Sequence, residues 1–552
     1  MLSRRQALKQ ITAFAALVAG GLTLVKRKKP SETDFPVRLL GPTLAAGHRL
    51  RSGDKFPEPS ATRKAQVVIV GGGIAGLSAA WRLKKKGATD FHILELEPEI
   101  GGNSRSGRNS VSRYPWGAHY VTLLSEEASI ARELLSELGI ITSHRGEATT
   151  YNEYDLCHAP HERLYIARKW QEGLVPKIGT SAEDTEQTNE FFRHVEEMRF
   201  KKGRDQKPVF AIPLEFSSRD PELLKLDQIT IADYMWARGW NSQALHWYVN
   251  YCCRDDYGTP HTQTSAWAGL HYFSSRRSQS EGAAGTSVIT WPEGNGRIVD
   301  GLESLIQDPN QDPNHERIHR GQMAIRVQNV KSGVEVDALD TKTGLVTRWQ
   351  AQAVIVASPR FIAARLGPEL TDQQSVFLKD LSYSPWVVAN ITLKSLPVNN
   401  RPNPGAPLSW DNVIYQNDSL GYVVANHQDT KIHSGETVWT YYRPLDALSP
   451  AEAREEAIKR QPSEWREIIL ADLGVAHPDL TELITSMDVW VWGHAMIRPT
   501  PGFIWGETRR AMQKPLGKIH FAHSDMSGLS LFEEANFHGA RAADEVISHG
   551  LT

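Results

Sequence analysis

The strongest hydrophobic pattern in the chain lies between residues 65 and 102. Residues 67–70 form an unbroken apolar run, which is typical of a short strand buried on both faces of a sheet. An amphipathic stretch follows, with lysines at 84–86 in its last turn, and predicts a helix that ends before Gly87. A second apolar run covers residues 91–94. The order strand, turn, helix, strand predicts a βαβ unit and an α/β fold.

Beyond this unit the pattern alternates between helical and strand character. Helical periodicity dominates from residue 125 to about 285. After residue 285, predicted strands and helices alternate, so the hydrophobic positions follow neither the helical nor the strand period throughout the chain. The expected helices lie at 128–138, 185–198, 231–237, 244–251, 298–305 and 451–470. The expected strands lie at 324–327, 333–336, 345–349, 353–357, 387–393 and 437–442.

Three glycines follow the first strand in a G-x-G-x-x-G turn: Gly71, Gly73 and Gly76. In such a turn the first glycine permits the tight bend, the second lets the backbone approach a pyrophosphate, and the third allows close helix packing. The N–H groups that open the helix at Ile74 and Ala75 then point at the phosphates. The turn therefore predicts a dinucleotide site, and the alternative is a glycine-rich turn in a βαβ unit without a ligand.

An acid and a second glycine pair follow in the register that this site requires. Glu95 comes at the end of the second strand, about 20 residues after the turn, where a carboxylate can accept the hydroxyls of an adenosine ribose. Gly101, Gly102 and Asn103 come next, in a run that resembles the E-x-x-x-x-x-G-G-R signature of FAD-binding oxidoreductases. This resemblance favours FAD over NAD.

Composition narrows the class of protein further. A chain of 552 residues is too long for one ordinary core and suits two domains. The 62 basic and 64 acidic residues nearly cancel, so no charge field for nucleic acid is expected. Sixteen tryptophans suit either ordinary cores or a large apolar pocket. The three cysteines, Cys157, Cys252 and Cys253, form no disulfide framework and are predicted to be unpaired thiols.

The first 29 residues resemble a twin-arginine export signal. Arg4 and Arg5 precede an apolar run at 11–25, which is shorter than the roughly 20 residues that span a bilayer. We expect a cleaved signal, export by the twin-arginine translocase and a periplasmic location. The basic residues 26–29 leave an uncleaved membrane anchor open as the alternative. Residues 30–63 are rich in proline, glycine and charge, and are predicted to be a tether.

Two further segments extend the resemblance to a family. Residues 113–120 resemble the loop beside the isoalloxazine ring in the flavin amine oxidase superfamily. Residues 517–543 contain a strand, an acid, a loop and a helix with the pattern G-x-R-A-A, and they resemble the C-terminal FAD segment of flavin amine oxidases, phytoene desaturases and protoporphyrinogen oxidases.

The resemblance implies a domain organisation and a set of cofactor contacts. It implies a Rossmann-like FAD-binding domain at 64–122, 288–360 and 490–552, interleaved with a mixed α+β substrate domain at 123–287 and 361–489. The implied contacts are Gly117, Ala118 and His119 beside the flavin, Ala324 at the adenine, Asp525 near the pyrophosphate and ribityl chain, and Glu534 and Ala535 at a helix N-terminus facing the flavin.

The chain departs from the family pattern at several positions. His523 and Glu534 replace glycines where a small residue normally lets the backbone approach the cofactor. Amine oxidases carry a lysine near flavin N5, and the corresponding strand here offers Ala389 or Asn390. The aromatic position before the last helix is Leu529 or Leu531. These departures weaken the case for an amine substrate and favour a C–C dehydrogenase or desaturase.

Few side chains qualify as catalytic candidates. His119 could meet the flavin or substrate, or be hydrogen-bonded structure. Asp255 and Asp256 could bind a cation or move a proton, or form a salt-bridged loop. His158 and His161 lack partners at ligand spacing, so no metal site is predicted.

These observations predict an exported FAD-dependent oxidoreductase with a small-molecule substrate. The reaction that we expect is transfer of a hydride from an amine to flavin N5. The first alternative is an FAD-dependent C–C dehydrogenase or desaturase of an apolar substrate. The second is a non-catalytic binding module, since Rab GDP-dissociation inhibitors resemble this fold without flavin catalysis.

Overall fold

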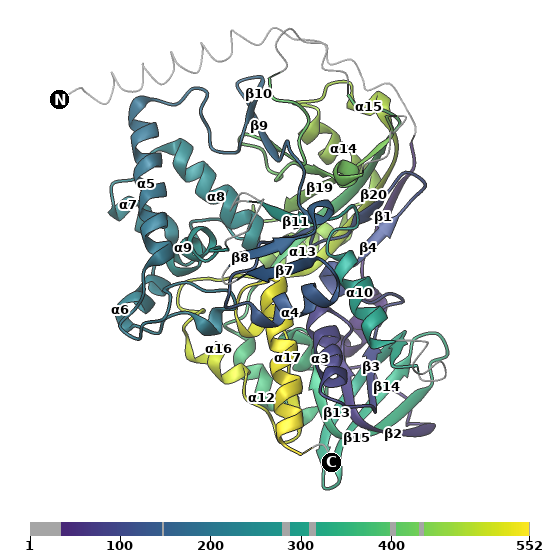
Figure 1. Ribbon diagram of the computed structural model, residues 1–552. Helices are drawn as coiled ribbons and strands as arrows, with labels where there is room; N and C mark the ends of the chain where they lie inside the picture. The colour runs from purple at the N-terminus through teal and green to yellow at the C-terminus, as the bar shows by residue number, and fades with distance from the viewer. Residues whose placement is uncertain are drawn as a thin grey trace, which may run out of the picture.

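The computed structural model describes residues 35–145, 148–278, 287–307, 316–397, 405–429 and 435–550. The twin-arginine segment predicted at 1–29 lies outside these residues. The described chain builds two large sheets at opposite ends of the molecule (Figure 1). No helix in the described ranges has both the length and the apolar character to cross a bilayer.

The first sheet has seven strands and contains the predicted βαβ unit. Strands β2 and β3 pair in parallel, and β15 extends the sheet in parallel beside β2. The antiparallel strands β13 and β14 complete it. Its strands are β2 (Ala61–Val70), β3 (Phe91–Glu95), β12 (Ile318–Arg320), β13 (Gln322–Val330), β14 (Gly333–Asp340), β15 (Val346–Val356) and β21 (Ile519–Phe521).

Two helices from opposite ends of the sequence cover one face of this sheet. They are α3 (Ile74–Lys85) and α17 (Phe532–Ser548). They pack so closely that a Cβ on Gly539 would lie 2.2 Å from the Ala75 carbonyl oxygen. Asn536 also donates a hydrogen bond to Ser78 across the contact (3.0 Å). The last helix is thereby fixed against the glycine turn at the start of α3.

The second sheet has eight strands in the order β1-β20-β16-β19-β18-β17-β9-β10. Alternate residues of its central strand β16 face opposite cores: Trp386 and Val388 lie on one side, Val387 and Ala389 on the other. Its strands are β1 (Val37–Leu40), β9 (Glu162–Ile166), β10 (Lys169–Glu172), β16 (Tyr383–Leu393), β17 (Asp411–Ile414), β18 (Tyr422–Val424), β19 (Thr437–Pro444) and β20 (Ile484–Ile497).

Helices cover both faces of the second sheet. A group drawn on the left of Figure 1 packs on the Trp386 side: α5 (Ala182–Phe200), α7 (Ile231–Ala237), α8 (Gln243–Tyr257) and α9 (Ala266–Ser274). Helix α14 (Pro462–Leu473) packs on the other side. The remaining helices and strands are α2 (Leu44–Ser52), α4 (Ser129–Glu137), α6 (Pro221–Leu224), α10 (Gly296–Ile306), α11 (Arg360–Ala363), α12 (Pro368–Leu378), α13 (Pro450–Lys459), α15 (Leu480–Leu483), α16 (Glu507–Met512), β4 (Ser106–Arg108), β5 (Arg113–Pro115), β6 (Tyr120–Thr122), β7 (Ile141–Arg145), β8 (Ala148–Tyr151) and β11 (Val288–Thr290).

The structure corrects four details of the predicted organisation. The tether predicted at 30–63 is folded from residue 35, because β1 pairs with β20 and α2 packs on the first sheet. The helix expected at 451–470 is two helices, since Pro462 forces Gln461 into an extended conformation. The boundary expected at residue 490 falls inside β20. Finally, Ala363, Leu366 and Leu370, expected in the substrate domain, pack in the core of the first sheet.

Candidate functional site

The glycine turn has the tight geometry that its sequence predicts. Gly71 has a φ of +107°, and a Cβ on Gly76 would lie only 1.9 Å from the Gly71 carbonyl oxygen. Glu95 is buried at the end of β3, and its carboxylate accepts the N–H of Gly72 (2.6 Å) and of Glu97 (2.8 Å). Burial raises the pKa of Glu95. The predicted acid therefore lies directly beside the turn.

The second glycine pair approaches the same turn. Gly101 donates its N–H to the Gly72 carbonyl (2.8 Å), and a Cβ on Gly102 would lie 3.4 Å from the Cα of Gly73. The carbonyl of Asn103 accepts the N–H of Ala118 (2.9 Å), and a Cβ on Gly117 would lie 2.4 Å from that carbonyl oxygen. Three segments predicted to contact the cofactor are thus held together by backbone contacts, and the one at Gly117 leaves no room for a side chain.

These surroundings fit FAD. Helix α3 has Gly73 as its N-cap and contains neither a capping side chain nor an acidic residue in its first turn, so its first N–H groups suit a phosphate. A Cβ on Gly73 would meet no protein atom closer than Gly102 Cα, at 4.0 Å, so backbone faces open space at this point. Glu95 would face the ribose, residues 71–76 the pyrophosphate, and residues 117–119 the flavin.

The remaining predicted contacts have mixed outcomes. Asp525 lies in a short 3₁₀ helix, Ser524–Met526, where its carboxylate accepts the Tyr383 hydroxyl (2.6 Å) and the Arg360 N–H (2.9 Å). Ala324 is buried in the core of the first sheet, on β13. Ala535 is half-buried and packs against the core beneath α3. Their roles at the cofactor stay predictions.

The Glu534 side chain is bonded within the protein, and a contact of its backbone with the cofactor stays a prediction. Its carboxylate accepts the Leu214 N–H (2.6 Å) and the Ser527 hydroxyl (2.5 Å), so it ties α17 to two loops. Burial raises the pKa of Glu534 to about 7. The neighbouring Glu533 faces the cavity described below instead and accepts the Thr122 hydroxyl (3.2 Å). Adjacent helix positions point about 100° apart, so the E-E pair alone could not tell which acid faces inward.

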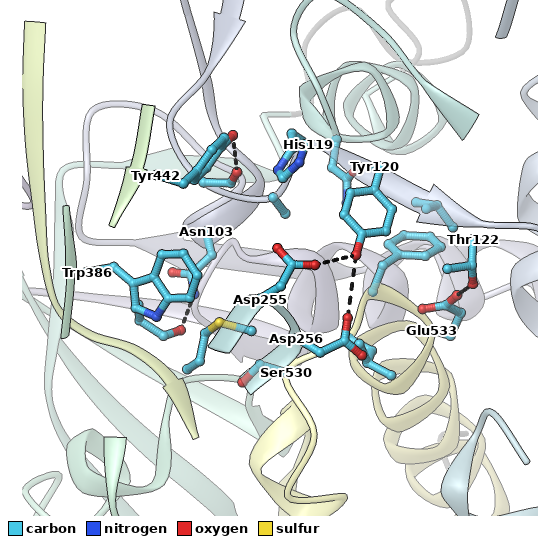
Figure 2. Close-up of a pocket in the computed structure, with 18 of the residues that line it drawn as sticks. Asn103, His119, Tyr120, Thr122, Asp255, Asp256, Trp386, Tyr442, Ser530 and Glu533 are labelled. Carbon is cyan, nitrogen blue, oxygen red and sulfur yellow. Dashed lines mark hydrogen bonds between the residues drawn. The ribbon is translucent and has the colours of Figure 1, made fainter. Parts of the chain in front are cut away.

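A cavity of about 150 Å³ opens beside residues 103 and 117–119 (Figure 2). It brings the candidates His119, Asp255 and Asp256 into one site, although they come from distant parts of the sequence. Residues that sequence reasoning did not single out complete its walls. These include Tyr120, Thr122, Arg276, Val388, Tyr442, Trp492, Met496 and Ser530.

The two aspartates differ in their partners. Asp256 forms an ion pair with Arg276 (2.8 Å). Asp255 accepts a hydrogen bond from the Tyr120 hydroxyl (3.2 Å), which also lies 3.4 Å from Asp256. Burial, followed by the nearby Asp256 carboxylate, raises the pKa of Asp255 to about 7. Besides Glu533, the cavity wall therefore holds one carboxylate that is paired with arginine and one that titrates near neutrality.

Aromatic rings, including those of His119, Tyr120 and Tyr442, form another part of the cavity wall. His119 stacks on Tyr442, with ring centroids 4.5 Å apart, and Tyr442 donates its hydroxyl to the Gly117 carbonyl (2.9 Å). Burial lowers the pKa of His119 to about 3, so the imidazole is neutral at pH 7. Trp410 lies edge-on to Tyr120 at 6.0 Å. His119 is thus part of an uncharged aromatic wall.

Strand β16, which resembles the lysine-bearing strand of amine oxidases, presents other side chains to the cavity. Ala389 faces the opposite core, and Asn390 is held by the Pro115 carbonyl (3.0 Å) and the Thr440 hydroxyl (2.7 Å). Trp386 and Val388 line the cavity, whose described walls contain no lysine. Before α17, Leu531 lines the cavity and Leu529 is buried in the core. The period-2 pattern of the strand could have indicated which residues face inward.

The structure also places the remaining predicted features. His161 contacts the Cys157 carbonyl through its ring (3.1 Å), and the described residues contain no cluster of His, Cys, Asp or Glu suited to a metal ion. Cys157, Cys252 and Cys253 are buried free thiols. His523, which replaces a family glycine, contacts the carboxylate of Asp525 (3.1 Å).

Known proteins resemble this chain in sequence and in fold. A family model described as flavin containing amine oxidoreductase matches residues 74–547. A flavin-containing amine oxidase of Oncorhynchus mykiss is 26% identical over 309 residues, which are 55% of this chain and 52% of that protein, so the chain matches about half of its length.

Solved structures show the same fold at low sequence identity. A variant of putrescine oxidase superposes with a TM-score of 0.65 at 15% identity, over 89% of this chain and all of that one. Cyclohexylamine oxidase from Brevibacterium oxydans superposes with a TM-score of 0.62 at 15% identity, over 88% of this chain and 99% of that one. Because the family model spans most of the sequence, the chain belongs to the flavin containing amine oxidoreductase family, whose cofactor is FAD.

Proposed function

We propose that this protein oxidises an amine at its C–N bond, using FAD as the hydride acceptor. The observation that carries the proposal is Asp255, a carboxylate in the cavity wall that has no ion-pair partner among the described residues. A protonated amine would supply the missing cation. Asp256 cannot serve in the same way, because Arg276 already neutralises it.

The chain's own residues would prepare the substrate for the reaction. FAD, when bound, accepts a hydride from the carbon next to the nitrogen. An amine gives up that hydride readily only as the free base, and Asp255, with a pKa of about 7, can accept the ammonium proton near neutral pH. Trp386, Tyr442 and Trp492 would exclude water and hold the carbon chain.

One observation favours the first alternative, an FAD-dependent dehydrogenase or desaturase that acts on a C–C bond. Val388, Met496 and Leu531 give the cavity an apolar side without the lysine and the aromatic residue of amine oxidases. Such a wall also suits dehydrogenation of a C–C bond in an apolar substrate. A protein that does not retain FAD would instead support the non-catalytic binding module.

Hydrogen peroxide production with a panel of amines tests the proposal. We expect activity with at least one amine, and we expect Asp255→Asn to lower kcat/KM about tenfold or more, because a charge-assisted contact is lost. Asp372→Asn, at an exposed aspartate on α12, is the matched control and should have no effect. Activity that survives Asp255→Asn unchanged would refute the assigned role.

We further propose export by the twin-arginine translocase to the periplasm, as Arg4, Arg5 and the apolar run at 11–25 support. Membrane attachment would follow only if the signal is not cleaved. Replacing both arginines by lysine should leave the folded protein in the cytoplasm, as fractionation would show. Unimpaired export of that variant would contradict the proposal.

A further inference from the structure

The hydroxyl of Tyr120 lies between the two aspartates of the cavity (Figure 2). Its oxygen is 3.2 Å from Asp255 Oδ2 and 3.4 Å from Asp256 Oδ1. A phenol hydroxyl carries one proton, and its oxygen can also accept a hydrogen bond. Tyr120 can therefore donate to only one of the two carboxylates at a time.

Regular elements hold these three side chains in place. Tyr120 begins β6, where its backbone pairs with Thr290 of β11, and its ring lies edge-on to that of His119 at 5.0 Å. The two aspartates lie in the last turn of α8. Ser384 on β16 donates its hydroxyl to the carbonyl of Gly258, the residue that ends this helix (2.6 Å). The fold therefore sets the distances between the hydroxyl and the two carboxylates.

Asp256 is held in place by an arginine. Both of its oxygens accept hydrogen bonds from Arg276 Nη2 (2.9 and 2.8 Å), and Asp256 itself is buried. Arg276 is fixed in turn, because Nη1 donates to the Tyr272 carbonyl (3.0 Å) and the guanidinium lies over the Tyr272 ring at 4.2 Å. Burial raises the pKa of Asp256, and the arginine acts against burial. Of the two aspartates, Asp256 is therefore the one that a cation stabilises as an anion.

Asp255 has a hydroxyl where Asp256 has an arginine. Burial and the Asp256 carboxylate raise the pKa of Asp255 to about 7, and the hydrogen bond from Tyr120 acts against them. Burial, together with the two carboxylates, raises the pKa of Tyr120 well above its ordinary value of 10. The phenol therefore keeps its proton at neutral pH, and Asp255 is the group that changes its protonation state.

Other titratable groups face these side chains from neighbouring elements. Two further acids are Asp411 on β17 and Glu533 on α17, and burial raises the pKa of each. The groups that are neutral at pH 7 are the phenols of Tyr251, Tyr272 and Tyr442, the Cys252 thiol and the His119 imidazole. In the described part of the chain, none of these groups is hydrogen-bonded to the Asp255 carboxylate, whereas Tyr120 is.

We propose that Tyr120 is a positioning residue whose hydroxyl serves both protonation states of Asp255. While Asp255 is ionised, Tyr120 donates its proton to that carboxylate. Once Asp255 has taken a proton from the substrate ammonium, it donates this proton to the phenol oxygen, and the Tyr120 proton turns to Asp256. Tyr120 keeps its own proton throughout, so the proton that is transferred passes from nitrogen to Asp255 alone. This inference rests on the proposed oxidation of an amine.

Infrared titration of the purified full chain, without substrate, tests the hydrogen bond directly. The carboxyl C=O band that is absent from Asp255→Asn reports the protonation of Asp255. We expect Tyr120→Phe to raise the midpoint of this band by about one pH unit, because a hydrogen bond to an anion is stronger than one to a neutral acid. Tyr442→Phe, in the same cavity wall, is the matched control and should leave the midpoint nearly unchanged, since its hydroxyl donates to the Gly117 carbonyl. An equal midpoint in Tyr120→Phe and the unsubstituted chain would overturn the proposal.

The pH profile of amine oxidation gives a second readout, which a merely structural role would not change in the same way. A shift of one unit leaves about one fifth as much ionised Asp255 at pH 7, so kcat/KM of Tyr120→Phe should be about fivefold lower there and should converge with that of the unsubstituted chain above about pH 9. A loss of equal size at every pH would overturn the proposal. A shifted infrared midpoint in a chain that oxidises no amine would instead refute the proposed function, and with it the source of the proton.

Discussion

At the scale of single residues, burial decides which acids can do chemistry. Asp255 and Glu534 are both held near a pKa of 7 by burial, yet only Asp255 borders the cavity. Both carboxylate oxygens of Glu534 accept hydrogen bonds from protein groups, so its protonation state affects the stability of the fold. The two residues therefore predict pH effects of different kinds.

Asp255 predicts a pH dependence of catalysis. Below about pH 7 its carboxyl is neutral and cannot pair with an ammonium ion, whereas above that pH it is ionised. We expect kcat/KM for an amine to rise as pH increases through about 7, and the Asp255→Asn variant to lose this limb of the profile. A rise that persists in the variant would assign the limb to another group.

Glu534 predicts a pH dependence of stability. Its folded pKa of about 7 exceeds its ordinary value of 4.5, so the folded state keeps a proton that the unfolded state loses. The free energy of unfolding should therefore fall by roughly 3 kcal/mol as pH rises from about 4.5 to 7. Urea denaturation of Glu534→Gln should show a smaller fall, whereas Glu467→Gln, at an exposed acid on α14, should match the unsubstituted chain.

At the scale of elements, the start of α3 is the predicted contact between the fold and the cofactor. Gly76 is required by the protein itself, because a side chain would overlap the Gly71 carbonyl. Gly73 has an ordinary backbone conformation, and a Cβ there would meet no protein atom closer than 4.0 Å. Two glycines in one turn thus serve different purposes.

These two glycines give a matched pair of variants. Gly76→Ala should lower the free energy of unfolding of the apoprotein by roughly 2 kcal/mol or more, through overlap with backbone. Gly73→Ala should leave apoprotein stability nearly unchanged and weaken FAD binding, because its methyl group occupies space near the pyrophosphate. Denaturation and FAD titration separate the two effects. A Gly73→Ala protein that binds FAD normally would show that the cofactor does not approach this turn.

Local patterns predicted elements well and contacts between distant segments poorly. The turn at 71–76 was predictable because its geometry depends on neighbouring residues alone. The bond from Tyr383 to Asp525 and the ion pair of Asp256 with Arg276 depend on how distant segments pack, and composition does not reveal this. The stretch 30–63 was predicted to be a tether for the same reason, since the strand within it, β1, pairs with β20 about 450 residues later.

At the scale of the whole molecule, the predicted cofactor site and the cavity draw residues from both sheets. The first sheet supplies the glycine turn and Glu95, and the second supplies Trp386, Val388 and Tyr442. Residues 35–56 are bonded to both sheets, through the pairing of β1 with β20 and through Thr43 to Glu97. Sequence motifs predicted the cofactor because FAD-binding turns have their own residue spacing. The substrate end depends on side chains that only the assembled fold brings together.

Anaerobic mixing of the purified full chain with amines, followed by visible absorption, tests the central claim most directly. A flavin spectrum that at least one amine bleaches, and that bleaches more slowly in Asp255→Asn, is the result that we predict. A flavin spectrum that no amine bleaches but an apolar C–C donor does would contradict amine oxidation in favour of dehydrogenation. A folded protein that stays colourless with added FAD would contradict the oxidoreductase itself.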